Sequence, residues 1–449
     1  MNPRHLYRIV VVSGIAAIAA ASQWAAETRH LTLTEAVHLA ISQNRALKIA
    51  RLKVVENEQK KAGERASYFP SITNQSNALH ITEFQNIGIP AGAFGTAGGS
   101  LVPARNTFLP QGQKTLLSSG TMITQPLTQL IRIHDANRIA AAEVAVSRDD
   151  LKKVENQTAL QVHSLYYSIL IAQLQKRAAE KQTTYAGEQL RESEDDVRNG
   201  SALQVSAINS RAVLLEGQQS VLTADLQISD LTTQLNDLLA LPLDTRLELD
   251  PAVPSNFEPR RREEYVQTAW AENPEILAAE EAVQKVRAAV GSAKSAYIPD
   301  VTAYARQSYQ NGVPFLVHNF GTFGVNLNWE LFDFGKRRAA VREREAQLAE
   351  AEENVRRLKE EVADGIERSY NKVERTRSMV QVATQVVKLR QEGERLAENQ
   401  LTNGVILVSD RRQAAAAAYT AEAEMLQASL GYLLAWAELE QVVGHTPGF

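Results

Sequence analysis

The longest pattern in the chain is an apolar stripe that runs through segments without proline. No proline occurs between Pro126 and Pro242, or between Pro314 and Pro447. In the second of these segments, apolar side chains recur at every third or fourth position, which is the spacing of one face of a packed helix. The stripe consists of Leu348, Ala351, Val355, Leu358, Val362, Ile366, Tyr370 and Val373. It returns later with Leu426, Leu430, Leu433 and Ala437. Both segments are therefore predicted to be helical.

Each segment has one favourable position for reversing its direction. Asn199-Gly200 interrupts the first and Asn403-Gly404 interrupts the second, and these residue types adopt left-handed backbone at little cost. Each segment is thus predicted to be a helical hairpin. The first arms are expected over residues 132–197 and 336–400, each roughly 100 Å long at ~1.5 Å per residue. Helices of this length favour a stalk, a filament or a tube over a compact globule.

A second pattern, of period two, comes before the second hairpin and predicts a β-strand with one apolar face. Its apolar positions are Phe323, Val325, Leu327, Trp329 and Leu331, and they alternate with Gly324, Asn326, Asn328 and Glu330. The preceding stretch, Val301 to Tyr309, predicts a partner strand with Thr302, Tyr304, Arg306 and Ser308 on one face. Trp329, Phe332 and Phe334 cluster as aromatic residues do at a membrane interface. Before the first hairpin the alternation is weaker, because Ser119, Thr121 and Gln125 share a face with Leu117, Ile123 and Leu127.

The two halves of the chain match each other. Ala40, Asn44, Tyr68, Pro70 and Thr73 recur 229 positions later as Ala269, Asn273, Tyr297, Pro299 and Thr302. Further along the offset is 204, as in Leu127 with Leu331 and Tyr166 with Tyr370. The first copy therefore holds 25 extra residues between Thr73 and Leu127. That stretch is rich in glycine and proline, which is loop composition.

The duplication divides the chain into two structural repeats. Residues 27–241 are predicted to form the first repeat, with a helical stretch from Thr34 to Ser67, a strand pair around a long loop at 74–120, and a hairpin. The second repeat is expected over residues 263–449, and it opens with a helical stretch from Glu263 to Ala296. Residues 242–262, which contain several prolines, are expected to link the copies.

The N-terminus reads as a secretory signal peptide. A basic start is followed by a run of 13 apolar and small residues from Ile9 to Ala21, too short to span a bilayer as a helix. Cleavage is expected between Ala21 and Ala26, so residues 1–26 would be removed. No later segment offers about 20 consecutive apolar residues, so a membrane crossing by the mature chain is expected to use strands.

Composition excludes several functions. The 449 residues carry a net charge of −4, which provides no basic field for nucleic acid. Cysteine is absent, which excludes disulfides, thiolate metal sites and a cysteine nucleophile. The histidines show no paired metal-ligand spacing, and there is no nucleophile elbow or phosphate loop. We therefore expect no enzyme activity, no cofactor and no metal.

The strand count predicts assembly. Two copies supply four strands, which cannot close a barrel, and an open sheet edge in lipid leaves backbone groups unpaired. Closure would need several chains, with eight strands from two chains or twelve from three. The alternative is a soluble sheet on a helical stalk, in a periplasmic or surface coiled-coil protein without a pore.

These residues together resemble the TolC-type outer-membrane efflux protein family. The opening run from Leu31 to Asn44, with Asn273-Pro274 in the second copy, resembles that family's N-terminal signature. Tyr68-Phe-Pro70 and Tyr297-Ile-Pro299 resemble its helix-to-strand junctions, and the run from Trp329 to Gly335 resembles its strand-to-helix junction. The resemblance covers nearly the whole mature chain, and it depends on the order and duplication of motifs that are individually unspecific.

The resemblance implies a mainly α fold with a small β part. Long antiparallel helical hairpins would form an α-barrel or coiled coil, and a homotrimer would close a 12-stranded β-barrel in outer-membrane lipid. The protein would be the exit duct of a tripartite efflux or type I secretion system, and a passive conduit. Its partners would be a periplasmic adaptor (membrane fusion) protein and an inner-membrane pump. The 25 extra residues would lie at the outer cell surface.

The resemblance also supplies candidate site residues at the hairpin turns. Members of the family often narrow the tunnel with acidic residues after the second turn, and Asp410 matches that position. Because Ser409 and Asp410 also begin a helix, capping of free N–H groups is an equally good reading. The first copy has Ser206 there, and Gln413 departs from a second acidic ring. Leu401 and Ile406 are apolar, unlike the polar links that hold some members shut. The adaptor is expected to contact the tips at Asn199, Gly200, Asn403 and Gly404.

Overall fold

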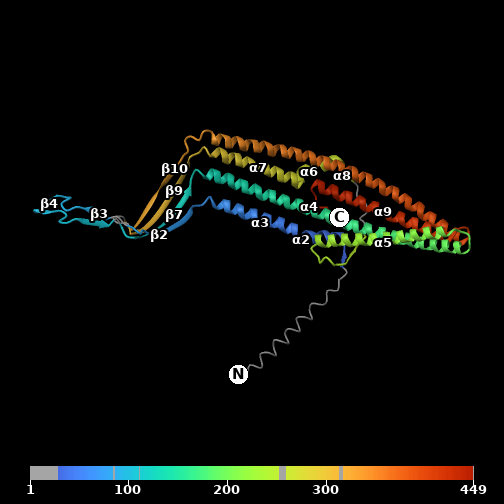
Figure 1. Ribbon diagram of the computed structural model, residues 1–449. Coiled ribbons are helices and arrows are strands. Elements are labelled where there is room, and N and C mark those ends of the chain that lie inside the picture. The colour runs from blue at the N-terminus through green and yellow to red at the C-terminus, as the bar shows by residue number, and fades with distance from the viewer. Residues whose placement is uncertain (1–28, 84–85, 111, 252–258, 313–316, 448–449) are drawn as a thin grey trace, which may run out of the picture. The chain divides into compact units, whose positions relative to one another are not determined.

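The computed structural model describes residues 29–447 except 84–85, 111, 252–258 and 313–316 (Figure 1). The predicted signal peptide, residues 1–26, lies outside the described residues, and so does part of the predicted link at 242–262. No helix in the described ranges is long and apolar enough to span a bilayer.

The chain divides into two compact units, each built from both repeats. The first unit comprises the chain up to Val54 together with Ser147–Ala278 and Val355–Phe449. The second comprises Val55–Val146 and Ala279–Asn354. Because each repeat contributes to both units, neither repeat is an independent domain in the structural sense.

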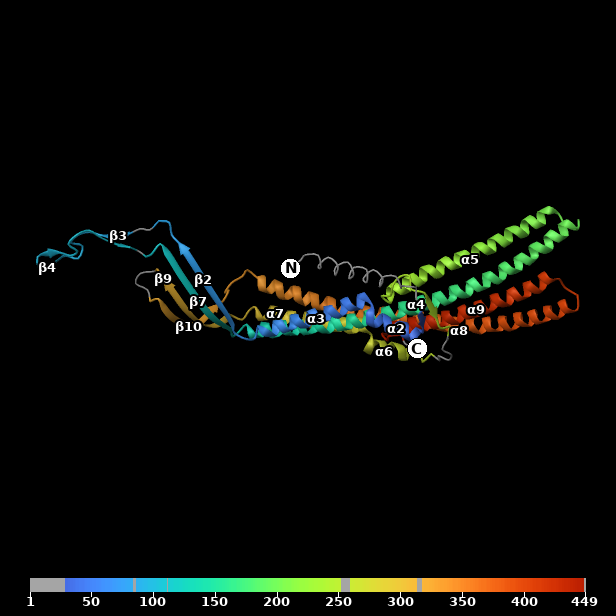
Figure 2. The ribbon, with the colours of Figure 1, turned by 90° about the horizontal axis from the view of Figure 1, so that it is seen from below.

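Two long helical hairpins dominate the fold (Figures 1 and 2). The first is formed by α4 (Leu130–Arg198) and α5 (Gln204–Leu238), and the second by α8 (Lys336–Thr402) and α9 (Val408–Val443). The predicted first arms, 132–197 and 336–400, agree with α4 and α8 to within two residues. The returning helices have only 35 and 36 residues, against 69 and 67 in the first arms. Each first arm therefore extends well beyond its own return helix.

Each opening stretch, predicted as one helix, is two helices. The first copy has α2 (Leu33–Gln43) and α3 (Arg45–Ala66), and the second has α6 (Arg262–Glu272) and α7 (Pro274–Ser295). The breaks fall at Asn44 and Asn273, where the backbone leaves helical geometry, with ψ of 133° and 120°. The prediction of a continuous helix was wrong because apolar spacing continues across a break that hydrogen bonds create.

Those hydrogen bonds come from the duplicated asparagines themselves. The side-chain oxygen of Asn44 accepts the Ala46 N–H at 2.8 Å, and its amide donates to the Leu238 carbonyl at 3.0 Å. Asn273 likewise accepts the Glu275 N–H at 2.8 Å and donates to the Val442 carbonyl at 2.8 Å. The oxygen thus begins one helix while the amide satisfies a carbonyl that the end of a returning helix leaves free.

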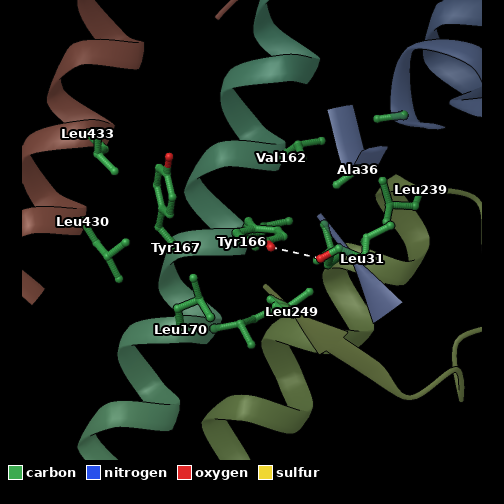
Figure 3. Packing of buried hydrophobic residues seen from close by; sticks show 14 residues of the cluster. Leu31, Ala36, Val162, Tyr166, Tyr167, Leu170, Leu239, Leu249, Leu430 and Leu433 are labelled. Atoms are coloured by element: carbon green, nitrogen blue, oxygen red, sulfur yellow. Dashed lines mark hydrogen bonds between the residues drawn. The ribbon is translucent and has the colours of Figure 1, made fainter. Parts of the chain in front are cut away.

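Two hydrophobic cores, largely one for each copy, hold the first unit together. The first core packs α2, α4 and α5 with part of α9 around Tyr166 and Tyr167 (Figure 3). It also includes the parallel pair β1 (Arg29–Leu31) and β8 (Leu247–Leu249). The hydroxyl of Tyr166 lies 3.0 Å from the Leu31 carbonyl and 2.8 Å from the Asp250 carbonyl, so this buried ring ties β1 and β8 to α4. The second core packs α6 and α7 against α8 and α9.

The second unit contains the sheet and the helical segments beside it. One charged contact joins both repeats there, since Glu143 of α4 lies 2.8 Å from the Lys60 ammonium of α3 and 3.0 Å from the Lys285 ammonium of α7. Hydrogen bonding from Lys60 helps to hold the pKa of Glu143 below its usual range. At the base of the sheet, the Thr128 hydroxyl donates to the Pro299 carbonyl and accepts the Val301 N–H.

The sheet is antiparallel and has four strands in the order β10-β9-β7-β2. The strands are β2 (Ser71–His80), β7 (Thr115–Pro126), β9 (Asp300–Asn311) and β10 (Asn319–Asn328). The two copies meet where β7 pairs with β9. Among the described residues, β2 and β10 each pair on one side only, so the sheet has two open edges.

The predicted loop at 74–120 is shorter than expected, because β2 and β7 extend into it. The reason is side-chain pairing across these strands: the Asn74 amide donates to the Thr121 hydroxyl at 2.9 Å, and the Ser76 and Ser119 hydroxyls lie 2.9 Å apart. From composition alone, these polar asparagine, serine and threonine residues are predicted to form a loop. Two small hairpins lie within the remaining connection, β3 (Asn86–Ile89) with β6 (Thr107–Pro110), and β4 (Thr96–Ala97) with β5 (Ser100–Leu101).

The last strand also differs from its prediction. β10 begins at Asn319 and ends at Asn328, so Trp329 and Leu331 lie beyond it, in an irregular stretch that leads to α8. The predicted aromatic cluster lies in and beside this stretch. The rings of Phe332 and Phe334 meet edge to face at 4.6 Å, and Phe334 is 92% exposed.

A histidine near the C-terminal end of α9 lies between two carboxylates. The Nδ1 atom of His445 is 2.8 Å from Glu440, and Nε2 is 3.0 Å from Glu272 of α6. Burial lowers the pKa of His445, but the hydrogen bonds and charges of Glu272 and Glu440 outweigh burial, so the pKa is raised above its ordinary 6.5. Protonated His445 therefore ties α6 to the end of α9.

This contact predicts a pH-dependent loss of stability in the His445→Gln variant. A raised pKa in the folded protein gives stability that is complete below about pH 6.5 and is lost as pH rises through the raised value. The melting temperature of the variant should thus fall further below wild type at about pH 6 than at about pH 8.5, by on the order of 1–2 °C for a half-exposed pair. Thermal circular dichroism in detergent measures this. His38→Gln, at an exposed histidine of α2, is the control, and an equal deficit at both pH values would contradict the interpretation.

Candidate functional site at the hairpin turns

Both hairpins reverse through the same glycine-dependent turn. Gly200 has φ +74° and Gly404 has φ +70°, which is left-handed backbone that a side chain would strain. The Gly200 N–H bonds to the Val197 carbonyl at 3.1 Å, and the Ser201 N–H bonds to the Asp196 carbonyl at 2.9 Å. This pair of hydrogen bonds defines a Schellman motif, in which the first residues past the helix satisfy its free carbonyls.

The second turn repeats these bonds residue for residue. The Gly404 N–H bonds to the Leu401 carbonyl at 2.9 Å, and the Val405 N–H bonds to the Gln400 carbonyl at 2.9 Å. Asn403 adds a bond from its side-chain amide to the Asn399 carbonyl at 2.8 Å. The four residues predicted to be adaptor contacts, Asn199, Gly200, Asn403 and Gly404, are all exposed. Both turns lie at the same end of the helices (Figures 1 and 2).

Asp410 lies in the first turn of α9 and is exposed. Its carboxylate accepts the Leu407 N–H at 3.1 Å, at the position where a helix leaves N–H groups free. The capping interpretation of Asp410 is therefore correct. An exposed carboxylate with one such bond keeps its remaining lone pairs for solvent or ions, so capping leaves the predicted constriction role open to test. Gln413 is also exposed, whereas Leu401 and Ile406 are half-buried.

The start of α9 is held by a second carboxylate, which comes from the other hairpin. Glu192 of α4 accepts the N–H of Ser409 at 2.9 Å, and Ser409 is 9% exposed. Glu192 has no distinguishing signal in the sequence, because it is one of several acidic residues near the end of α4 and only the packing of α4 against α9 distinguishes it. In the first hairpin, Leu203 is the N-cap of α5 and makes no side-chain capping bond.

Further contacts join the two hairpins along α4 and α9. The Lys181 ammonium lies 4.8 Å from the centre of the Tyr419 ring, and the Gln175 amide lies 3.4 Å from the Gln427 side-chain oxygen. Within the second hairpin, Arg411 of α9 pairs with Glu398 of α8 at 2.5 Å. Of these contacts, the pair of Arg411 and Glu398 lies near the second turn, and Leu401 and Ile406 take no part in it.

The residues at the turns are suited to binding and not to catalysis. Among the described residues no group of three or more histidine, aspartate or glutamate side chains is placed to hold a metal ion. The turns present small exposed residues, exposed backbone and exposed carboxylates, among them Asp196 and Asp410. Such a surface can bind another protein or attract cations.

The fold is that of TolC-type outer-membrane channel proteins. The structure is similar to the Campylobacter jejuni CmeC outer membrane channel, with a TM-score of 0.73 at 15% identity over 92% of this chain and 85% of that one. The predicted class, a helical barrel of hairpins combined with strands for a β-barrel, is confirmed at the level of fold.

Sequence comparison agrees with the fold. Residues 265–445 match the profile of the outer membrane efflux protein family. The chain is 25% identical to the outer membrane efflux protein BepC of Brucella suis over 78% of this chain and 71% of BepC. It is 22% identical to the alkaline protease secretion protein AprF of Pseudomonas aeruginosa over 68% of this chain and 65% of AprF. The chain therefore resembles outer membrane efflux proteins in sequence over residues 265–445 and in fold over nearly its whole length, and its structural neighbours are outer membrane channels.

The contact between Glu192 and α9 predicts the effect of removing it. In Glu192→Ala the buried N–H of Ser409 loses its acceptor, which costs about 1 kcal/mol for a half-exposed carboxylate. Hydrogen exchange at residues 405–412 should then speed up by about fivefold, as measured by mass spectrometry. The matched control is Glu194→Ala, two residues along α4, where the carboxylate is exposed and exchange should not change. Equal acceleration in both variants would show that helix charge, and not this bond, is responsible.

Proposed function

We propose that this protein is one protomer of a homotrimeric exit duct in a tripartite efflux or type I secretion system. It would be a passive conduit across the periplasm and outer membrane, without catalysis. The open four-stranded sheet carries this proposal.

The two free edges of the sheet are suited to each other. Successive strands in the order β10-β9-β7-β2 alternate in direction, so β2 and β10 run oppositely. The β2 strand of one copy can therefore continue the antiparallel ladder onto β10 of the next. Three copies would give twelve strands and leave no edge, which removes the unpaired N–H and C=O groups that lipid does not tolerate.

The helical hairpins also expose surfaces that favour self-assembly. On α5, several large apolar side chains are more than half exposed: Val205, Ile208, Leu215, Leu222 and Leu226. A shallow apolar groove runs between α8 and α9 and is lined by Met379, Val382, Val386, Ala421 and Ala428 among others. Exposed apolar surface on this scale marks an interaction site. In a ring of copies, α5 of one protomer would cover the groove of its neighbour.

The partners follow from the turns and the relatives. AprF is named as a protease secretion protein and BepC as an efflux protein, so the pump served by this chain could belong to either system. A periplasmic adaptor would bind the exposed tips and couple them to an inner-membrane pump. The cargo would then be set by the pump.

The proposal predicts a detergent-stable trimer that conducts ions. Size-exclusion chromatography with light scattering on protein extracted from the outer membrane should give three times the mature chain mass. Planar bilayers containing it should show discrete conductance steps. Recovery in the soluble periplasm as a non-conducting coiled coil would favour the alternative of a structural protein without a pore.

Asp410 is proposed to form the pore constriction, once from each of three protomers. Like charges in a narrow ring attract cations. Asp410→Asn keeps a side-chain oxygen for the Leu407 N–H and removes only the charge. We expect the ratio of cation to anion permeability to fall by about threefold, as a change of about one kT in local potential gives. Reversal potentials in a salt gradient measure this ratio. If they do not change, Asp410 serves only as a helix cap.

The turns are proposed to contact the adaptor. Since the chain has no cysteine, single-cysteine variants are clean probes. Asn199→Cys and Asn403→Cys should each form cross-links to the co-expressed adaptor with a short bismaleimide. Glu374→Cys, at an exposed position midway along α8, is the control and should form none. If only the Glu374→Cys control formed cross-links, the adaptor would bind along α8 and the proposed contact at the turns would be wrong.

A further inference from the structure

The sheet contains one charged side chain, that of Arg306, without an ion pair among the described residues. In the four strands β2, β7, β9 and β10, only Asp300 and Arg306 are charged at neutral pH. Asp300 lies at the base, where it pairs with Arg132. Arg306 lies in the middle of β9, opposite Thr322 of β10 and Met122 of β7. Within the described residues Arg306 has no ion pair.

The guanidinium of Arg306 rests on a glycine of the neighbouring strand. A Cβ atom at Gly120 of β7 would lie 2.8 Å from Nη2 and 2.9 Å from Nε of Arg306. Any larger residue at position 120 would therefore displace the guanidinium. The ring of Tyr304 lies in the same way over Gly324 of β10, where a Cβ would be 3.2 Å from the hydroxyl. Two large side chains thus lie flat along one face of the sheet, where glycines make room for them.

The strand register shows which face this is. Arg306 and Tyr304 share a face with Thr302 and Ser308, as predicted from the sequence. The opposite face carries Phe323, Val325 and Leu327, which are 88%, 65% and 61% exposed. It also carries the cross-strand pair Ile72 and Ile123. In a barrel closed within lipid, the apolar face is outside and the polar face lines the lumen.

We propose that Arg306 gives the outer-membrane part of the duct a preference for anionic solutes. This inference rests on the proposed trimeric barrel, in which three copies of Arg306 would face the lumen at one level. A guanidinium is charged at every physiological pH, and a ring of arginines inside a pore attracts anions. Because the side chain lies along the wall, it adds charge without narrowing the passage.

The simpler role for Arg306 is to clamp β7 to β9 by packing over Gly120. Both roles predict that some substitutions harm assembly, so charge must be varied while packing is kept. Arg306→Lys keeps the charge and most of the stem, whereas Arg306→Gln removes the charge and keeps a shorter polar side chain. A structural clamp needs the planar group and would lose function in both variants, but an electrostatic role would survive in the lysine variant.

The test uses ion selectivity of the trimer in planar bilayers. We expect Arg306→Gln to lower the ratio of anion to cation permeability by about threefold, equivalent to about one kT of potential, and Arg306→Lys to leave it near wild type. In Arg306→Cys, a cationic methanethiosulfonate reagent should restore the ratio, and an anionic sulfonate reagent should lower it further. The Cys variant keeps the test decisive if the glutamine variant fails to assemble.

The matched control is Val325→Cys on the apolar face, which lipid should shield from both water-soluble reagents. If the wild-type trimer conducts but its selectivity is the same in Arg306→Gln, and reagents at Arg306→Cys do not shift it, the Arg306 inference is overturned and the duct stands. If Val325→Cys reacts and Arg306→Cys does not, the faces are reversed and the inference fails. If no preparation conducts, the proposed function itself fails.

Discussion

The sheet edges are the constraint on which the rest of this structure depends. A strand at an open edge leaves a row of backbone N–H and C=O groups unpaired, and hydrocarbon offers them no partner. This chain has four strands and two such edges, at β2 and β10. The opposite directions of these two strands allow copies to close on one another. In the proposed trimer, neighbouring copies would cover the apolar surface that is exposed on α5 and in the groove between α8 and α9.

Duplication explains how a single chain supplies both the sheet and the hairpins. Each repeat contributes a strand pair and one hairpin, and the copies join through the β7–β9 ladder and the contacts of Glu143 with Lys60 and Lys285. The joints are also duplicated, since Asn44 and Asn273 each start a helix and bind the end of a returning one. The copies differ near the turns, where only the second return helix is capped by carboxylates, from Asp410 and Glu192.

Most of the fold could be predicted from the sequence, because the long helices follow from the regular spacing of apolar residues along the chain. The apolar stripe ending at Val373 and the Asn-Gly pairs predicted the ends of the first arms to within two residues. What it missed depends on contacts between distant residues. At the break at Asn44, the side chain also binds the carbonyl of Leu238, 194 positions away. The polar part of β2 has the composition of a loop, and it is recognised as a strand only from its pairing with β7, as between Asn74 and Thr121. Glu192 becomes distinct only when α4 meets α9.

The charges of the proposed conduit are arranged unevenly, and the arrangement follows from what each region must do. The turns are proposed to bind a partner, and Asp410 lies exposed in the first turn of α9, where its capping bond to Leu407 holds the carboxylate without burying it. The sheet must remain stable in lipid, so its strands carry almost no charge, and Asp300 is paired at the base. Arg306 is the exception that needs a reason. Its guanidinium lies across Gly120 in the middle of the strand and has no acidic partner among the described residues, so in the proposed barrel its charge would be available to solutes in the lumen.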